Sequence, residues 1–309
     1  MRPLIIVLIF VYSNSFGQET KFVLKDGGGF QEEYYVLKSD KKIKHGTYAK
    51  YRAPFGQIVM IETCNYSNGE KHGQWTAFYN EFSKKTWNKI RERGNYVNGK
   101  KNGVWVSYYL DTAASIANME KVNTEGQSKS VSVNIEQKTE KLKQAGMYLN
   151  DKRVGEWTSF YSNGNIDQKY NFSTSKLLYD NSLTDTLIYN TDRKPLFIGG
   201  QSRLSEFLLP NRNLINSISN NKEDSTKAII MFFIDEQGRT ENITIDANVK
   251  NKSFKDEITK LIASTDLNWI PGLKEGTKTK QSLRLSYNII RTENLENTKR
   301  WRSFYKILE

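Results

Sequence analysis

The sequence has 309 residues, of which 37% are hydrophobic and 12% aromatic, enough for a packed core and about two domains. Its 46 basic and 34 acidic residues give a formal net charge of +12, and the excess is spread along the chain. A dispersed excess is not typical of a nucleic-acid groove, so nucleic acid is excluded as the expected partner. Cys64 is the lone cysteine, so the core of the protein must hold the fold without an internal disulfide.

The first residues have the pattern of a secretory signal peptide. Arg2 supplies a positive charge, residues 4–12 are apolar, and small residues come before Gln18. The apolar run is shorter than the roughly 20 residues of a spanning helix, and no cysteine follows it as in a bacterial lipoprotein. We expect residues 1–17 to be removed near Gly17-Gln18 and the chain to be exported, periplasmic or associated with an outer membrane. An uncleaved anchor is the alternative. Residues 18–42 follow as a polar N-terminal segment.

A fourteen-residue motif then occurs three times without a gap. It begins with Tyr, has Gly seven positions later and Trp two positions after that Gly, and ends in an aromatic pair whose last member is Tyr. The repeated positions are Tyr66, Gly73, Trp75 and Tyr79, then Tyr96, Gly103, Trp105 and Tyr109, then Tyr148, Gly155, Trp157 and Tyr161. An eroded copy surrounds Gly46.

Each copy of the motif predicts a β-hairpin. Asn68-Gly69 and Asn98-Gly99 tolerate the positive φ angles of tight turns, and Asn150-Asp151 is a weaker version. The second glycine is expected to let the chain enter the return strand without a Cβ clash. Alternation then places the Trp, a small residue and the final Tyr on one face of the return strand. The small residues are Ala77, Ser107 and Ser159. Because a single hairpin cannot bury its own face, we expect stacked hairpins whose aromatic residues are scaffold rather than a ligand platform.

Over residues 43–172, the pattern Tyr-x-Asn-Gly-x-Lys/Arg-x-Gly-x-Trp-x-x-aromatic-Tyr resembles a MORN-type repeat, in the bacterial variant often labelled as an antitoxin component. The resemblance implies an elongated array of stacked β-hairpins, which we place at residues 43–180. The antitoxin role is not carried over, because it does not suit an exported protein. An insertion at about residues 111–144 interrupts the array, as an extended solvated hairpin or as a mobile loop.

After residue 181 the sequence changes to a helix, a hairpin, a second helix and a closing strand. Pro210 ends the first helix, the hairpin turns at Asp235–Gly238, and residues 267–278 form a loop before the last strand. The apolar positions of the two helices and the hairpin are Leu204, Phe207 and Leu208; Ala228, Ile230, Phe232, Ile234, Ile243 and Ile245; and Phe254, Ile258, Leu261 and Ile262. The fold class is therefore mainly β, with a small α+β domain at residues 185–291.

Three motifs of this second half, Pro195-x-Phe197-x-Gly199-Gly200, Phe233-Ile234-Asp235-x-x-Gly238 and Trp269-x-Pro271-Gly272, resemble the C-terminal domain of TonB-like proteins. The resemblance covers about residues 190–291. It implies a domain whose edge strand pairs with a segment of an outer-membrane transporter. The family's Tyr-Pro after the first helix is replaced here by residues 213–216, and the chain has five prolines rather than a long proline-rich linker. Energy transduction is therefore the alternative hypothesis.

The candidate docking strand is the closing strand, residues 282–290, which alternates Leu283, Leu285, Tyr287 and Ile289. No further strand pattern follows it, so its free edge is expected to take up an extended peptide. The alternative is that the C-terminal tail, residues 292–309, folds back over this edge and covers apolar surface with Trp301, Phe304 and Tyr305.

No residue pattern supports catalysis, a cofactor or a metal site. His45 and His72 each precede a repeat glycine and are expected to flank turns. Cys64 is expected to be buried, with a reactive or intermolecular thiol as the alternative. The glycine runs at residues 26–29 and 197–200 lack the Lys and Ser or Thr of a phosphate-binding loop.

We therefore expect a non-enzymatic, exported scaffold and binding protein of the cell envelope. Its partner is expected to be an envelope protein or peptide that docks on the C-terminal domain. A third hypothesis is a membrane-surface binder that uses the basic residues at the hairpin turns, Lys71, Lys100, Lys101, Lys152 and Arg153. Because such charges also keep turns and sheet edges soluble, we expect weak or no binding to membranes. No oligomeric state is predicted.

Overall fold

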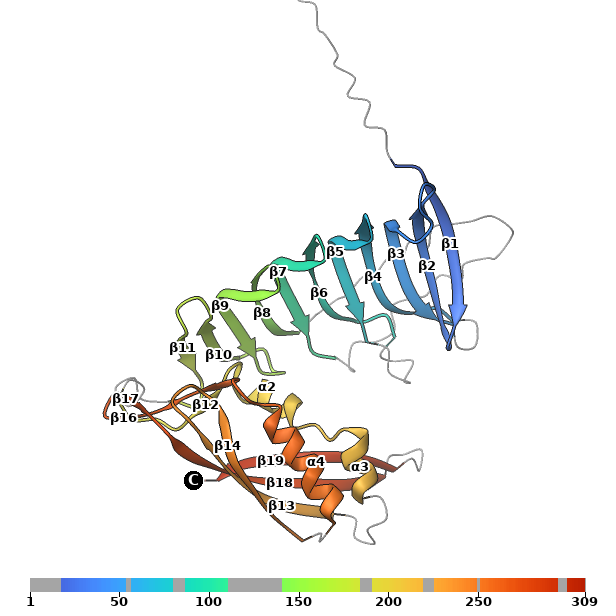
Figure 1. The fold of residues 1–309 in the computed structure, drawn as a ribbon. Coiled ribbons are helices and arrows are strands. Elements are labelled where there is room, and N and C mark those ends of the chain that lie inside the picture. The colour runs from blue at the N-terminus through green and yellow to red at the C-terminus, as the bar shows by residue number, and fades with distance from the viewer. Residues whose placement is uncertain are drawn as a thin grey trace, which may run out of the picture. The chain divides into compact units, whose positions relative to one another are not determined.

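The computed structural model describes residues 18–53, 57–79, 87–110, 141–183, 191–218, 225–248, 251–293 and 299–308. Eleven strands form one antiparallel sheet in which the order of the strands follows the chain (Figure 1). A smaller four-stranded sheet with three helices follows them, which confirms the mainly β fold class. The predicted signal peptide and residues 111–140 of the predicted insertion lie outside the described residues. The chain divides into two units, Met1–Lys101 and Asn102–Glu309.

Unit 1 holds the first six strands of the large sheet, β1 (Thr20–Gly27), β2 (Phe30–Leu37), β3 (Lys44–Arg52), β4 (Val59–Ser67), β5 (Glu70–Phe78) and β6 (Ile90–Val97). The strands β1 and β2 lie in residues 18–42, where the sequence analysis identified only a polar segment. They pair over their full length around a turn at Gly28-Gly29, with φ angles of 64° and 80°. The sequence shows only a weak strand pattern here, because the apolar residues of β1 lie between Lys21 and Lys25 and two of them, Phe22 and Leu24, remain exposed.

The repeat turns have the backbone that the sequence predicts. The turn residues Asn68 and Asn98 both have φ angles of 49°, and the glycines that follow them are also in the left-handed region. The second glycine of each copy has a φ of 60° to 74°. A Cβ at Gly103 or Gly155 would meet no atom within 4 Å, so the predicted clash is the wrong reason for these glycines. They are required by the left-handed backbone at a point where the strand register shifts.

Unit 2 begins with the rest of the large sheet and continues with the α+β part. The remaining strands of the large sheet are β7 (Lys100–Tyr108), whose first two residues still belong to unit 1, β8 (Leu142–Leu149), β9 (Lys152–Phe160), β10 (Ile166–Asn171) and β11 (Lys176–Asp180). The later elements are β12 (Leu196–Phe197), α2 (Gly200–Phe207), α3 (Arg212–Ile218), β13 (Ser225–Ile234), β14 (Thr240–Ala247), α4 (Lys252–Ala263), β15 (Trp269–Ile270), β16 (Gly272–Lys274), β17 (Thr277–Thr279), β18 (Gln281–Glu293) and β19 (Lys299–Leu308). The predicted loop at residues 267–278 thus contains β15, β16 and the first residues of β17.

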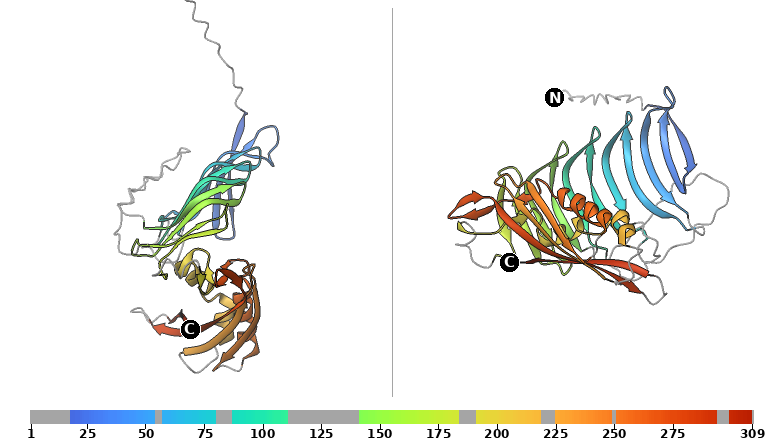
Figure 2. Two further views of the ribbon diagram at one scale, coloured as in Figure 1. Left: turned by 90° about the vertical axis from the view of Figure 1, so that its left-hand side faces the viewer. Right: turned by 60° about the horizontal axis from the view of Figure 1, so that its bottom comes forward.

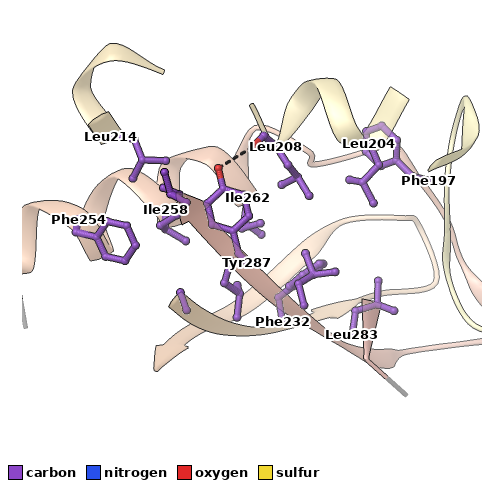
Figure 3. Packing of buried hydrophobic residues seen from close by; sticks show 14 of the residues in the cluster. Phe197, Leu204, Leu208, Leu214, Phe232, Phe254, Ile258, Ile262, Leu283 and Tyr287 are labelled. Atoms are coloured by element: carbon purple, nitrogen blue, oxygen red, sulfur yellow. Dashed lines mark hydrogen bonds between the residues drawn. The ribbon is translucent and has the colours of Figure 1, made fainter. Parts of the chain in front are cut away.

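The core of the α+β part lies between the helices and one face of the sheet β14-β13-β18-β19 (Figure 2). The predicted alternation in β13 is confirmed, since Ala228, Ile230, Phe232 and Ile234 are each at most 2% exposed. The side chain of Asn251 caps α4 by accepting from the Ser253 amide, and the apolar stripe of this helix faces the sheet (Figure 3). Each such buried side chain stabilises the fold by about 1.5–3 kcal/mol.

The three motifs that resemble a TonB-type domain meet in this core. The rings of Phe197 and Trp269 pack edge to face with centroids 5.1 Å apart. Gly238 lies against the backbone of Trp269, where a Cβ would come within 2.2 Å of the carbonyl oxygen. Asp235 holds the turn before this glycine, because its Oδ1 accepts from the amides of Gln237 and Arg239. The residues of these motifs therefore serve to pack the core and to form its turns.

The C-terminal tail is part of the small sheet. Its strand β19 pairs with β18 in one continuous antiparallel register, from Arg284 opposite Leu308 to Glu293 opposite Lys299. The prediction that residues 282–290 offer a free edge is wrong, and the alternative that the tail folds back over them holds in the structure. Basic residues interrupt the apolar positions of residues 299–308, so the sequence showed no strand pattern there.

Candidate functional site

The repeat tryptophans belong to the core of the large sheet. Trp75, Trp105 and Trp157 are between 1% and 7% exposed. The ring of Trp75 packs edge to face on Tyr96 at 6.1 Å, and the ring of Trp105 packs on Tyr148 at 5.6 Å. The repeat tyrosines and glycines are partly buried beside them. This arrangement leaves no row of open tryptophan rings for a ligand.

The end of the motif departs from simple alternation. Register shifts next to Ala77 and Ser107 bury the first ring of the final aromatic pair, Phe78 or Tyr108. The predicted core residues Tyr79, Tyr109 and Tyr161 are only partly buried. Of the three small residues, Ala77 and Ser159 are buried as predicted, whereas Ser107 is partly exposed.

The five basic residues of the hairpin turns differ in how far they are engaged by neighbouring side chains. The ammonium groups of Lys71 and Lys101 form salt bridges with glutamates of the neighbouring strand. The guanidinium of Arg153 lies 4.4 Å from the ring centre of Trp157. Lys100 and Lys152 are exposed to solvent. With three of the five engaged within the sheet, the turns offer few free charges to a membrane surface.

The predicted docking residues Leu283, Leu285, Tyr287 and Ile289 are between 0% and 3% exposed. They point from β18 into the core, where the Tyr287 hydroxyl donates to the carbonyl of Leu208 at 2.7 Å (Figure 3). Since β18 lies between β13 and β19, the outer strands of this sheet are β14 and β19. A partner strand would therefore have to add to one of those two.

A polar junction in unit 2 was missed by the sequence analysis. The buried carboxylate of Asp167 on β10 accepts from the amides of Gln201 and Ser202 and so caps α2, with the shorter bond of 2.7 Å to Ser202. The neighbouring side chain of Gln168 accepts from the Gly199 amide at 2.6 Å and donates to the carbonyl of Phe197 at 2.9 Å. The run of polar residues Asp167-Gln168-Lys169 within this strand was the available signal. These bonds fix the start of α2 against the last hairpin of the array.

The histidines and the cysteine take ordinary structural places. His45 accepts from the Asn68 amide in a neighbouring turn, and His72 is exposed. Cys64 is buried as expected, and burial raises the pKa of its thiol to about 12, so the thiol stays protonated and unreactive at neutral pH. Within the described ranges, no group of three His, Cys, Asp or Glu side chains gathers as a metal site would require.

The described part of the chain has no helix that is long and apolar enough to cross a membrane. The array of paired hairpins is compatible with a MORN-like repeat array. Comparison of the chain with models of protein families, with curated proteins and with solved structures found no match.

Proposed function

We propose that this chain is a non-enzymatic binding protein of the cell envelope, which docks an extended segment of a protein or peptide partner along β19. The observation that carries the proposal is the outer edge of β19. This strand has ten residues in unbroken register with β18, and no described strand pairs with its other side. Unpaired amide and carbonyl groups on such an edge accept an added strand, with affinity from the backbone and selectivity from the side chains.

The other outer strand, β14, is less suitable for strand addition. Its register with β13 shifts between Met231 and Phe233, and Asn242 has a φ of 52° close to that shift. A bulge of this kind interrupts the regular spacing of donors and acceptors on an edge. The strand β19 has no such interruption, and its sequence contains four Lys or Arg residues, which favours an acidic partner segment.

The two resemblances support the same proposal. In TonB-like C-terminal domains a sheet edge pairs with a segment of an outer-membrane transporter, and the order of helices and strands after residue 190 is similar. The MORN-like array then serves as a scaffold that carries this domain. The signal-peptide pattern of residues 1–17 supports an envelope location, in the periplasm or at an outer membrane.

The test places a photo-crosslinking amino acid at Lys306 on β19, or at Thr244 on β14 as the matched control. Both positions are exposed. We expect envelope protein to crosslink at position 306 and not at 244. A synthetic peptide of the crosslinked segment should then protect amides of residues 299–308 from hydrogen exchange, and leave those of residues 240–247 unchanged. Protection of β14 or of the repeat array instead would contradict the proposal.

Two neighbouring proline variants, Arg302→Pro and Ser303→Pro, give an independent test. Successive residues of an edge strand point their N–H groups alternately toward the paired strand and toward the open side. One variant therefore breaks a bond to β18, and the other removes a donor only from the open edge. We expect the variant with the unchanged melting temperature to lose the peptide. Full binding by that variant would exclude docking on β19.

A further inference from the structure

The repeats of unit 1 share an internal carboxylate site. In the copy that contains Trp75, the Glu62 carboxylate accepts from the Lys71 ammonium at 3.0 Å and from the Trp75 indole N–H at 2.9 Å. In the next copy, Glu92 accepts from Lys101 at 3.4 Å. Each lysine follows its glutamate by nine residues. In both copies the same place in the repeat is thus filled by a carboxylate that pairs with the lysine, and the Lys71 ammonium also lies 5.7 Å from the ring centre of Trp75.

The third copy keeps the cation and lacks the carboxylate. Gln144 stands at the glutamate position and Arg153 follows it by the same nine residues. The Arg153 guanidinium lies 4.4 Å from the ring centre of Trp157, and its Nε donates to the Tyr148 hydroxyl at 3.3 Å. No described carboxylate forms a salt bridge with it. The Trp157 indole N–H donates to the Met147 carbonyl instead, at 3.0 Å.

A second arginine adds charge to the same place. Arg203 of α2 and Gln144 both lie close to Gly199. A Cβ added at Gly199 would be 2.6 Å from the Cδ of Arg203 and 2.9 Å from the side-chain amide nitrogen of Gln144. Burial, together with the nearby charge of Arg153, lowers the pKa of Arg203 to about 10. The adjacent carboxylate of Glu206 already forms a salt bridge with Lys143. The positive charge of Arg153 therefore acts on a second guanidinium, that of Arg203, which is itself buried.

A small cavity opens at this point. It has a volume of about 10 Å³, and Gln144, Arg153, Trp157 and Gly199 are among the residues that line it. That space is the size of one water molecule, so it suits one oxygen of a ligand's carboxylate and leaves the rest of the ligand outside. Two of the residues that line the cavity, Arg153 and Gln144, have side chains that can donate hydrogen bonds.

We propose that this cavity, the Arg153 site, binds a carboxylate group that takes the place of the missing glutamate. A guanidinium binds a carboxylate with two parallel hydrogen bonds, and the pairing is stronger where water is partly excluded. A free small carboxylate and an Asp or Glu side chain of a partner share this chemistry. The inference is independent of docking along β19.

The experiment measures the melting temperature of the chain beginning at Gln18 while sodium acetate is titrated at constant ionic strength with sodium chloride. Binding to the folded state stabilises it by RT ln(1 + L/Kd), where L is the ligand concentration, so the melting temperature should rise with the logarithm of the acetate concentration once that concentration exceeds Kd. Neutral acetamide is the control ligand. A blocked peptide with a single Glu, Ac-Gly-Glu-Gly-NH2, forms the second arm. A rise in melting temperature with acetate would identify the ligand as a free carboxylate. A rise with the peptide alone would identify it as an Asp or Glu side chain of a partner.

The deciding variant is Gln144→Glu, which restores the internal carboxylate of the other repeats. It should raise the melting temperature without any ligand and abolish the response to acetate and peptide. Gln74→Glu makes the same change of charge at an exposed position of β5 and should leave the response intact. Arg153→Lys keeps the charge but loses the two-point contact, and should weaken binding about tenfold. An equal response in Gln144→Glu, or no response to either ligand in the unaltered protein, would overturn the proposal.

Discussion

Replacement of Gly146 by alanine tests whether the ring of Trp157 is locked in the sheet. A Cβ at position 146 would lie 2.2 to 2.5 Å from three atoms of this ring, far inside an ordinary contact of 3.4 Å or more. The ring is held by its bond to the Met147 carbonyl, by edge-to-face packing on Tyr148 at 5.1 Å and by the guanidinium of Arg153. It cannot shift by about 1 Å without loss of one of these contacts.

The expected cost of Gly146→Ala is about 1–3 kcal/mol, the usual range for an overpacked core. In a unit of this size, that lowers the melting temperature by about 2–12 °C. Scanning calorimetry of the full chain measures the shift, and tryptophan fluorescence reports whether the indole environment has changed.

Gly27→Ala on β1 is the matched control. Gly27 also lies in a strand without a positive φ, but no atom comes within 4 Å of an added Cβ. This variant should be neutral or stabilised by up to about 1 kcal/mol, since alanine reduces the freedom of the unfolded chain. Equal melting temperatures for the two variants would refute the locked ring and would favour an open, mobile tryptophan face.

Three further outcomes are expected. Asp167→Ala should destabilise unit 2 by about 0.5–2 kcal/mol through loss of the α2 cap, measured by urea denaturation against the exposed control Asp246→Ala. Tyr287→Phe should cost about 1–3 kcal/mol, because a buried carbonyl loses its donor; a smaller change would show that another group replaces the hydroxyl. Burial raises the pKa of the Cys64 thiol from 9.0 to about 12. The contribution of this thiol to the free energy of unfolding is therefore complete below pH 9 and is lost as the pH rises from 9 to 12. Cys64→Ala should therefore flatten the alkaline fall of the melting temperature.

Local sequence signals were sufficient for the hairpins. The turn dipeptides and the repeated glycines require positive φ angles, and the structure has those angles at the same residues. The alternation of β13 and the helical spacing of α4 likewise predicted which side chains are buried. Such signals depend only on residues a few positions apart, and so they can be read without the rest of the fold.

Signals that depend on distant partners were missed or misread. The tail strand β19 contains many charges, and its pairing with β18 became visible only when both were placed in one sheet. The same holds for Asp167, whose carboxylate caps a helix that begins more than thirty residues later. The change from Glu62 and Glu92 to Gln144 was visible in the aligned repeats. It acquired meaning only when the structure showed what the glutamates bind.

The sequence by itself determined the repeat, the hairpin turns, the buried faces of β13 and α4, and the mainly β class. Turn geometry and burial periodicity are local properties, and each is set by the residues that show it. The tertiary structure decided which strands are at the edge of a sheet and which repeat cation has no carboxylate beside it. Both depend on contacts between residues that are far apart in the sequence, and a local pattern does not specify such contacts.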